Sequence, residues 1–270
     1  MSPYFSKLLS TILDRAVIAL RDHTCSRLSK QWEIRGYSRI YHYHIRKTGG
    51  KSINFMFLRL LDEDMHKLYK SINIARDRRV IHNGLAVSGW KLDVIQRGQY
   101  YFGYSHGSYD EFLLPPNTFT LTCFRDPLNR LLSHYNMLRK YQDKKIPHPC
   151  MQREGPWLGN NFDDFLDNIP RAAAMNQLGM FSSKFDIDEA LERVKGLSHV
   201  MFTESFEQGV KQLNSKTGLS LQPLHTHKTG FHEPIDEILL QKARELLEYE
   251  YDFLNRVCYY LKVPSYKIDL

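Results

Sequence analysis

The sequence SRIYHYHIRKTGGKS, residues 38–52, predicts the fold because it passes from a strand to a loop to a helix. Residues 40–45 are aromatic, β-branched or histidine, a composition typical of a β-strand. A loop with two glycines and two lysines follows, and residues 53–61 carry apolar side chains at helical spacing. Such an arrangement directs backbone N–H groups and cationic side chains at one point. We therefore expect residues 46–52 to bind an anion.

The rest of the chain has the composition of a globular protein. It has 270 residues, of which 42% are hydrophobic and 25% charged, which is enough apolar material for a core. The net charge of +7 favours anionic partners such as nucleotides, acidic polysaccharides, nucleic acid or a membrane surface, although it also suits simple solubility.

Strands alternate with helices along the sequence. Patterns typical of strands cover residues 40–45, 80–82, 99–104, 118–124 and 199–202, and helical patterns cover about 52–61, 127–140, 162–168, 171–180, 188–195, 204–214, 234–249 and 252–261. This alternation predicts an α/β fold, a parallel sheet covered by helices on both faces. We expect a polar stretch at 62–79, an exposed loop at 141–161 and an irregular segment at 225–234.

No repeat or linker divides the sequence, so we expect a single domain at residues 38–270 after an N-terminal helical extension at 1–37. Apolar residues at helical spacing in 8–20 predict an amphipathic helix that packs against the domain or, alternatively, contacts a membrane surface weakly. No transmembrane span or signal peptide is visible, which favours a cytoplasmic protein. The four cysteines lack metal-binding spacing and are expected to be reduced thiols, with two disulfides as the alternative.

The ending Gly50-Lys51-Ser52 is similar to that of a Walker A loop, but two features oppose a nucleoside triphosphatase. The motif needs a glycine where this chain has Ile45, and Arg125 follows the strand at 118–124 where a magnesium-binding acid is expected. We therefore expect a compact anion held without a dedicated metal. Lys47 and Lys51 offer charge, Thr48 and Ser52 offer hydroxyl groups, and Gly49 and Gly50 allow a close backbone approach.

Two motifs resemble those of one known family. HIRKTGGKS, residues 44–52, resembles the 5′-phosphosulfate loop of carbohydrate sulfotransferases, usually written HIPKTGGTS. FRDPLNRLLSHY, residues 124–135, resembles their 3′-phosphate motif, FxRDPxxRxxSxY, and the order of the two motifs also agrees. Within that family, the motifs resemble those of the Golgi-type enzymes that include heparan and dermatan 2-O-sulfotransferases, and of their soluble bacterial counterparts.

The resemblance implies a P-loop-like α/β fold and the donor 3′-phosphoadenosine 5′-phosphosulfate, or PAPS, with PAP as the product. It implies that Lys47 contacts the bridging oxygen and that the backbone of residues 48–52 cradles the 5′ phosphate. Arg125 and Ser133 would hold the 3′ phosphate, since a guanidinium meets phosphate through two parallel hydrogen bonds. Lys228 lies where the family has a loop that closes over the nucleotide.

The transfer requires the acceptor hydroxyl to lose a proton, a task that suits histidine. His106 follows the strand at 99–104 at the sheet edge where ligands bind, and its surroundings resemble the histidine-bearing loop of the 2-O-sulfotransferases. Tyr104 stands where those enzymes have a second histidine. Arg46 replaces the usual proline of the loop, which affects its rigidity, and Lys51 replaces threonine or serine, which adds charge.

The acceptor is expected to be a hydroxyl on a carbohydrate, with peptides, lipid head groups and small metabolites as alternatives. Acceptor contacts are expected from residues 62–97 and 141–161, where Trp157 is either a stacking surface or a structural residue. The alternative functions are a P-loop kinase or related nucleoside triphosphatase, and a non-catalytic polyanion-binding protein. No zinc-finger spacing, arginine-rich run or RNA-binding aromatic signature indicates a nucleic-acid partner.

Overall fold

The structure is a computed structural model that describes residues 34–82, 84–224 and 234–266. The expected amphipathic helix at 8–20 and the segment that contains Lys228 lie outside these residues. No helix within the described ranges is long and apolar enough to span a membrane. Cys123, Cys150 and Cys258 are buried free thiols, as expected for them.

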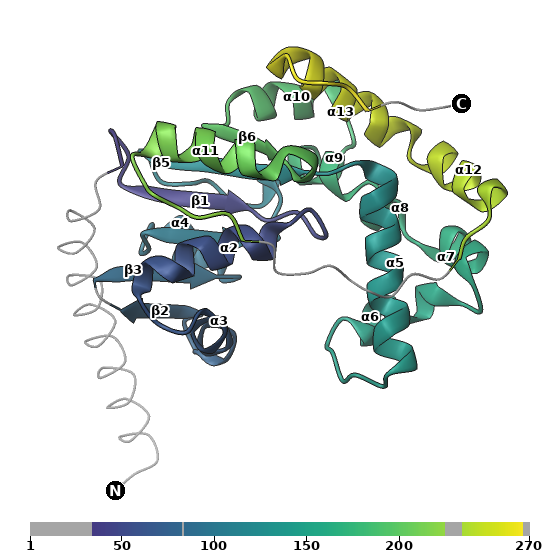
Figure 1. Cartoon of the computed structure of the whole chain (residues 1–270), viewed down its shortest axis with the longest axis horizontal. Coiled ribbons are helices and arrows are strands. Elements are labelled where there is room, and N and C mark those ends of the chain that lie inside the picture. Colours follow the sequence, from purple (N-terminus) through teal and green to yellow (C-terminus); the bar gives the residue numbers. More distant parts are fainter. Residues whose placement is uncertain (1–33, 83, 225–233, 267–270) are drawn as a thin grey trace, which may run out of the picture.

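One six-stranded sheet forms the centre of the molecule, in the order β2-β3-β4-β1-β5-β6 (Figure 1). The strands are β1 (Arg39–Tyr43), β2 (Arg79–His82), β3 (Leu85–Gly89), β4 (Phe102–Ser105), β5 (Thr118–Phe124) and β6 (His199–Phe202). β1 is parallel to both β4 and β5, and the pairs β3–β4 and β5–β6 are parallel as well. The predicted α/β fold is therefore confirmed.

The sheet is not entirely parallel, because β2 pairs with β3 in the antiparallel direction. The connection between these strands is too short for a parallel crossover, so the chain has to reverse in a hairpin. Gly84 takes part in this turn with a φ of 83°, a conformation that favours glycine. The prediction of a parallel sheet is thus wrong at this edge.

Helices surround the sheet. They are α2 (Gly50–Leu58), α3 (Met65–Ile74), α4 (Leu92–Gln96), α5 (Pro127–Asp143), α6 (Met151–Glu154), α7 (Phe162–Asn168), α8 (Arg171–Ala174), α9 (Asn176–Phe181), α10 (Ile187–Lys195), α11 (Phe206–Thr217), α12 (Glu237–Leu246) and α13 (Glu248–Leu261). Short 3₁₀ segments are η2 (Arg59–Leu61), η3 (Tyr109–Glu111), η4 (Gly155–Leu158) and η5 (Thr203–Ser205).

The two faces of the sheet carry separate hydrophobic cores, because side chains alternate along a strand. On one face, Ile40 of β1 packs in a cluster with α2, α3 and α11. On the other, Tyr41 and Tyr43 pack in a cluster with α4, α9, α10 and α13. A third cluster joins α5, α7 and α12, which lie beside the sheet with α6, on the right of Figure 1.

α5 begins as its sequence predicts. The Asp126 side chain accepts a hydrogen bond from the backbone N–H of Asn129 at 2.7 Å, and Pro127 occupies the first helical position. Both features stabilise a helix start, since they satisfy or remove backbone donors that have no partner within the helix. This start fixes the direction in which Arg125 leaves β5.

Two segments predicted without regular structure are ordered. The polar stretch at 62–79 contains α3, whose Leu68 and Ile72 are buried, and the predicted acceptor segment up to residue 97 also contains β2, β3 and α4. The expected exposed loop at 141–161 contains α6 and η4, with Glu154 and Leu158 buried. Few, widely spaced apolar residues are enough to anchor such short elements, which makes their sequence patterns weak.

Candidate functional site

The candidate site lies where the carboxyl ends of β1, β4 and β5 meet. Tyr43 at the end of β1 pairs with Ser105 of β4 on one side and with Thr122 of β5 on the other. The loop at 44–49, His106 and Arg125 therefore leave the sheet at the same edge. In open α/β sheets, ligands bind at the carboxyl ends of the strands. They bind at the point where two neighbouring strands continue into connections that run in opposite directions.

The loop between β1 and α2 is a tight turn held by its own hydrogen bonds. Lys47 and Gly49 have φ values of 67° and 80°, and Gly49 is the N-cap of α2. The Thr48 hydroxyl donates to the carbonyl oxygen of Ile45 at 3.0 Å, so it shapes the loop instead of pointing to a ligand. No acidic residue lies in the first turn of α2, which leaves this helix start electrostatically suited to an anion.

Gly50 is required by a close approach of a side chain. A Cβ atom at this position would lie 1.9 Å from Cδ2 of His44, a contact that no larger residue can make. The His44 imidazole is thus packed directly against the first residue of α2, which holds the anion loop onto β1.

Lys47 and Arg125 form the cationic centre of the site. Nη1 of Arg125 donates to the carbonyl oxygen of Lys47 at 3.2 Å, so the residue after β5 is bonded to the loop after β1. Burial, together with the charges of Arg125 and Arg46, lowers the pKa of Lys47 to about 8. Among the described residues no carboxylate lies within ion-pair distance of the Lys47 ammonium. This local excess of positive charge favours an anionic ligand.

Lys51 and Ser52 lie in the first turn of α2. The Lys51 ammonium lies 5.1 Å from the ring centre of Phe55 and 5.6 Å from that of Tyr69, so its charge is turned toward α3. Burial lowers its pKa. Ser52 is buried in the first turn of α2. Of the two loop lysines, the structure therefore brings Lys47 to Arg125 and Lys51 to the aromatic residues.

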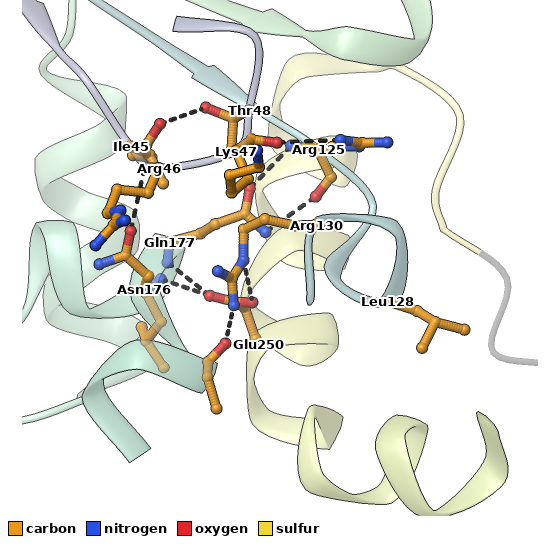
Figure 2. A network of polar contacts seen from close by, with 12 residues as sticks. Ile45, Arg46, Lys47, Thr48, Arg125, Leu128, Arg130, Asn176, Gln177 and Glu250 are labelled. Carbon is orange, nitrogen blue, oxygen red and sulfur yellow. Dashed lines mark hydrogen bonds and ion pairs between the residues drawn. The ribbon is translucent and has the colours of Figure 1, made fainter. Parts of the chain in front are cut away.

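Gln177, at the start of α9, holds Arg125 by its backbone (Figure 2). Its Oε1 accepts from the Arg125 N–H at 2.8 Å and its Nε2 donates to the Arg125 carbonyl at 2.9 Å. The neighbouring Asn176 accepts from the N–H of Arg46 at 3.3 Å through Oδ1. No sequence pattern singled out these two residues, because an amide at a helix start is usually on the surface.

A buried ion pair supports Gln177 from below. Oε1 of Glu250 accepts from the backbone N–H groups of Gln177 and Leu178 at 2.6 and 3.3 Å, and Oε2 lies 3.5 Å from Nε of Arg130. Arg130 and Glu250 are both fully buried. Burial raises the pKa of Glu250, whereas Arg130 opposes this shift. Arg130 belongs to the second motif, yet its side chain faces Glu250 and not the cationic centre.

His106 stands at the end of β4, beside the loop. Its Nδ1 lies 2.5 Å from the His44 carbonyl oxygen, which can only accept, so the proton is on Nδ1 and Nε2 carries a lone pair. Its ring centre lies 4.7 Å from that of Trp90 and 4.7 Å from that of His44. These rings lie against it, and desolvation lowers its pKa below the usual 6.5, although the residue as a whole is exposed to solvent. With a pKa below 6.5, the neutral form of His106 predominates at pH 7.

Asn54 joins His42 of β1 to His44, which follows that strand. Nδ1 of His42 lies 2.9 Å from Oδ1 of Asn54, and Nδ2 of Asn54 lies 3.3 Å from Nδ1 of His44. Burial lowers the pKa of both histidines, to about 4 for His42. Neutral imidazoles thus fix the position of the His44 carbonyl that orients His106.

Arg46 ties the loop to the segment after α5. Its guanidinium forms an ion pair with Glu154, and Oε2 of Glu154 lies 2.9 Å from Nε2 of His134. Burial raises the pKa of Glu154, but the hydrogen bonds from His134 and Arg46 outweigh it and lower the pKa to about 2. A proline at position 46, as the resemblance would lead one to expect, would have no guanidinium to pair with Glu154 and no backbone N–H to donate to Asn176. In this protein the contacts of Arg46, and not a proline ring, restrain the loop.

Ser133 and Trp157 complete the predicted residues. Ser133 is half-buried on α5, three residues after Arg130, and its side chain makes no hydrogen bond within the described part of the chain. Trp157 of η4 is partly buried against the third cluster, 6.0 Å from the ring of His134. Its packing is that of a structural residue.

A separate surface depression lies at the other end of α2. It is lined by Arg59, Asp62, Glu63, Asp64 and Met65. Three carboxylates in this set oppose an anionic ligand. The depression is therefore a different feature from the cationic centre at the sheet edge.

The chain was also compared with known proteins. No protein-family model matches it, and no curated protein matches it.

Proposed function

We propose that the protein is a sulfotransferase that moves the sulfuryl group of PAPS to an acceptor hydroxyl on a carbohydrate. The observation that carries the proposal is the hydrogen bond from Arg125 to the Lys47 carbonyl. It joins two cationic loops, each followed by a helix start, at one sheet edge. A nucleotide with phosphate groups at both its 5′ and 3′ positions matches two adjacent anion sites better than a single phosphate does.

The donor would lie along the two loops. Lys47 would neutralise the charge that develops on the 5′ phosphate as it leaves, and backbone N–H groups of residues 48–52 would hold that phosphate. Arg125, with Ser133 on α5, would hold the 3′ phosphate. Lys228, outside the described residues, is proposed to close over the nucleotide.

His106 would act as the general base. Its Nε2 lone pair takes the hydroxyl proton of the acceptor while the hydroxyl oxygen forms a bond to sulfur. The bond between sulfur and the bridging phosphate oxygen breaks, and its electron pair leaves with PAP. The neutral state of His106 and its proton on Nδ1 both support this role, since a base must be unprotonated at the atom that receives the proton.

The test is a titration of the protein with PAP, 5′-AMP and ATP with magnesium. We expect PAP to bind more tightly than 5′-AMP, and Arg125→Ala to lose this preference by roughly 10- to 100-fold, the range for hydrogen bonds to a charged group. Arg97→Ala, at the exposed residue that caps the end of α4, is the matched control and should keep this preference.

Transfer of labelled sulfate from PAPS to a panel of glycans, lipids and small alcohols then identifies the acceptor. Magnesium-dependent ATP turnover by a protein that does not bind PAP would contradict the proposal and favour a kinase or nucleoside triphosphatase. Tight, salt-sensitive binding of a polyanion without PAP binding would favour a non-catalytic role.

A further inference from the structure

We propose that Asn176 and Gln177, here called the α9 clamp, are positioning residues that set the separation between the two anion-binding loops. The clamp would make the protein selective for a nucleoside 3′,5′-bisphosphate over a monophosphate. This inference rests on the proposed function, which supplies the two loops with their ligand.

The first observation is the way Gln177 holds Arg125. A single amide group pairs with both the N–H and the carbonyl of that residue, at 2.8 and 2.9 Å. The carbonyl can only accept and the N–H can only donate, so the orientation of the amide is determined by its partners. Gln177 is fully buried, and water cannot replace either bond. The backbone of Arg125 is therefore fixed relative to α9.

The second observation is that the preceding residue of α9 reaches the other loop. Oδ1 of Asn176 accepts from the N–H of Arg46 at 3.3 Å, and Arg46 is bonded to Lys47 through the chain. Figure 2 shows both amide side chains leaving the start of α9 toward the two loops. Since Arg125 donates to the Lys47 carbonyl, the contacts close a ring that passes through the clamp and both loops.

A buried ion pair lies at the base of this ring. Glu250 accepts from the Gln177 backbone at 2.6 Å and pairs with the buried Arg130. Nη2 of Arg130 donates to the Ala173 carbonyl at 3.2 Å, just before α9. A buried ion pair is weak evidence for stability, because apolar residues of similar volume often stabilise as well. Its position under the clamp instead suits a role in holding α9 at a defined place.

This ring of hydrogen bonds restrains the distance between the two anion-binding loops before the ligand arrives. Preorganisation of this kind raises the affinity for a ligand that fills both sites, because the loops lose less conformational entropy on binding. A ligand with one phosphate uses one loop and gains less. Removing the clamp should therefore change the ratio of bisphosphate to monophosphate affinity, and not only the stability of the fold.

The experiment measures dissociation constants for PAP, 5′-AMP and 3′-AMP with purified full-length variants. Gln177→Leu keeps the side-chain volume and loses both hydrogen bonds to Arg125. We expect it to weaken PAP by roughly tenfold, the order for one or two lost buried hydrogen bonds, and to leave 3′-AMP and 5′-AMP nearly unchanged. Asn176→Ala should likewise weaken PAP, with little effect on either monophosphate.

Ser182→Ala is the matched control, since it removes a buried hydrogen bond from Ser182 to Glu189 just beyond the other end of α9. It should lower the melting temperature without changing the affinity ratio. If Gln177→Leu does not fold, Gln177→Glu gives the same measurement, because it retains an acceptor for the Arg125 N–H and loses the donor.

The outcomes separate the two proposals. A wild-type protein that prefers PAP, together with a folded Gln177 variant that keeps the wild-type ratio of PAP to 5′-AMP affinity, would overturn the clamp alone. A wild-type protein with no preference for PAP would overturn both the clamp and the proposed function.

Discussion

Lys47 has an unusually low pKa for a lysine. Lys47 is half-buried, and desolvation together with the charges of Arg125 and Arg46 lowers its pKa to about 8 from 10.5. A lysine in this state is still charged at pH 7, yet it loses its proton in a range where most lysines keep theirs. An anion bound beside it would favour the charged form.

The affinity for PAP should consequently depend on alkaline pH. Lys47 is mostly a cation at pH 7 and about half deprotonated near pH 8, so affinity should begin to fall between pH 7 and 8 and fall further as the pH rises. Lys47→Arg should remove the fall, because a guanidinium stays charged throughout. Calorimetric titrations with PAP from about pH 7 to 9.5 test this, over a range where its phosphates keep one charge state. A constant affinity of the wild type across that range would remove Lys47 from the anion site.

His106 can be tested by turnover. His106→Ala should lower the rate of sulfate transfer roughly 10²- to 10⁴-fold and leave PAP affinity nearly unchanged, since the ring serves the acceptor proton. His82→Ala, at the far edge strand β2, is the control. Because burial lowers the pKa of His106, the acid decline in wild-type turnover should begin below pH 6.5 as protonation blocks Nε2. Near wild-type transfer by His106→Ala would exclude it as the base.

At the scale of elements, the site depends on how the loop after β1 is held by segments distant in sequence. α9 reaches it through Asn176, and α6 reaches it through the ion pair of Glu154 with Arg46. The side chain of Glu154 is only 4% exposed, whereas that of Arg46 is 26% exposed. The energy of such a pair lies between that of a surface pair and that of a fully buried one.

A double-mutant cycle can measure this restraint. We expect Arg46→Ala and Glu154→Gln to be coupled by about 1–3 kcal/mol in the free energy of unfolding, because each single change leaves a partly buried partner without its counter-charge. The exposed pair Arg97–Asp93 serves as the reference and should couple by less than about 0.5 kcal/mol. Equal coupling in the two cycles, from denaturant unfolding, would mean that Arg46 does not hold the loop.

At the scale of the whole molecule, neutral histidines are distributed through the core. His42, His134 and His199 are each at most 2% exposed, and burial lowers the pKa of each to about 4 from 6.5. Hydrogen bonds to Asn54, Glu154 and the Gly209 carbonyl raise these pKa values, but by less than burial lowers them. The unfolded chain therefore binds more protons than the folded one between pH 6.5 and about 4.

The free energy of unfolding should fall as the pH is lowered through this window. The raised pKa values of Glu250 and Asp126 act in the opposite direction, whereas the lowered pKa of Glu154 adds to the effect of the three histidines. His199→Gln should flatten the decline, because glutamine does not titrate and can still donate to the Gly209 carbonyl. Denaturant unfolding at several pH values tests this, with His82→Gln as the control. A stability that is constant from pH 7 to 4 would show that these histidines do not control acid unfolding.

Local sequence patterns predicted much of the architecture. The strand at 118–124 and the start of α5 agree with the structure to the residue, because a continuous apolar run and an Asp-Pro helix start are strong local signals. β3 and α4 were not predicted, since five-residue elements show too little periodicity. The antiparallel pairing of β2 was missed for the same reason, as its partner was not recognised.

For the candidate site, too, local patterns predicted some features and missed others. The glycine loop, Lys47, His106 and Arg125 were all placed at one sheet edge from their positions after predicted strands, and the structure brings them to that edge. Spacing did not reveal that Thr48 bonds within its own loop, that Lys51 turns toward Tyr69, or that Arg130 faces Glu250. Side-chain direction depends on neighbours that are far away in sequence.

What the sequence alone determined is the order of strands and helices and the loops that follow them, because hydrophobic periodicity, helix caps and glycine conformations act over a few residues. Only the tertiary structure decided which groups restrain the site. Gln177 meets Arg125 across 52 positions and Glu154 meets Arg46 across 108. A buried amide or carboxylate is stable only with a partner, and that partner exists only once the sheet has brought α9, α6 and the loops together.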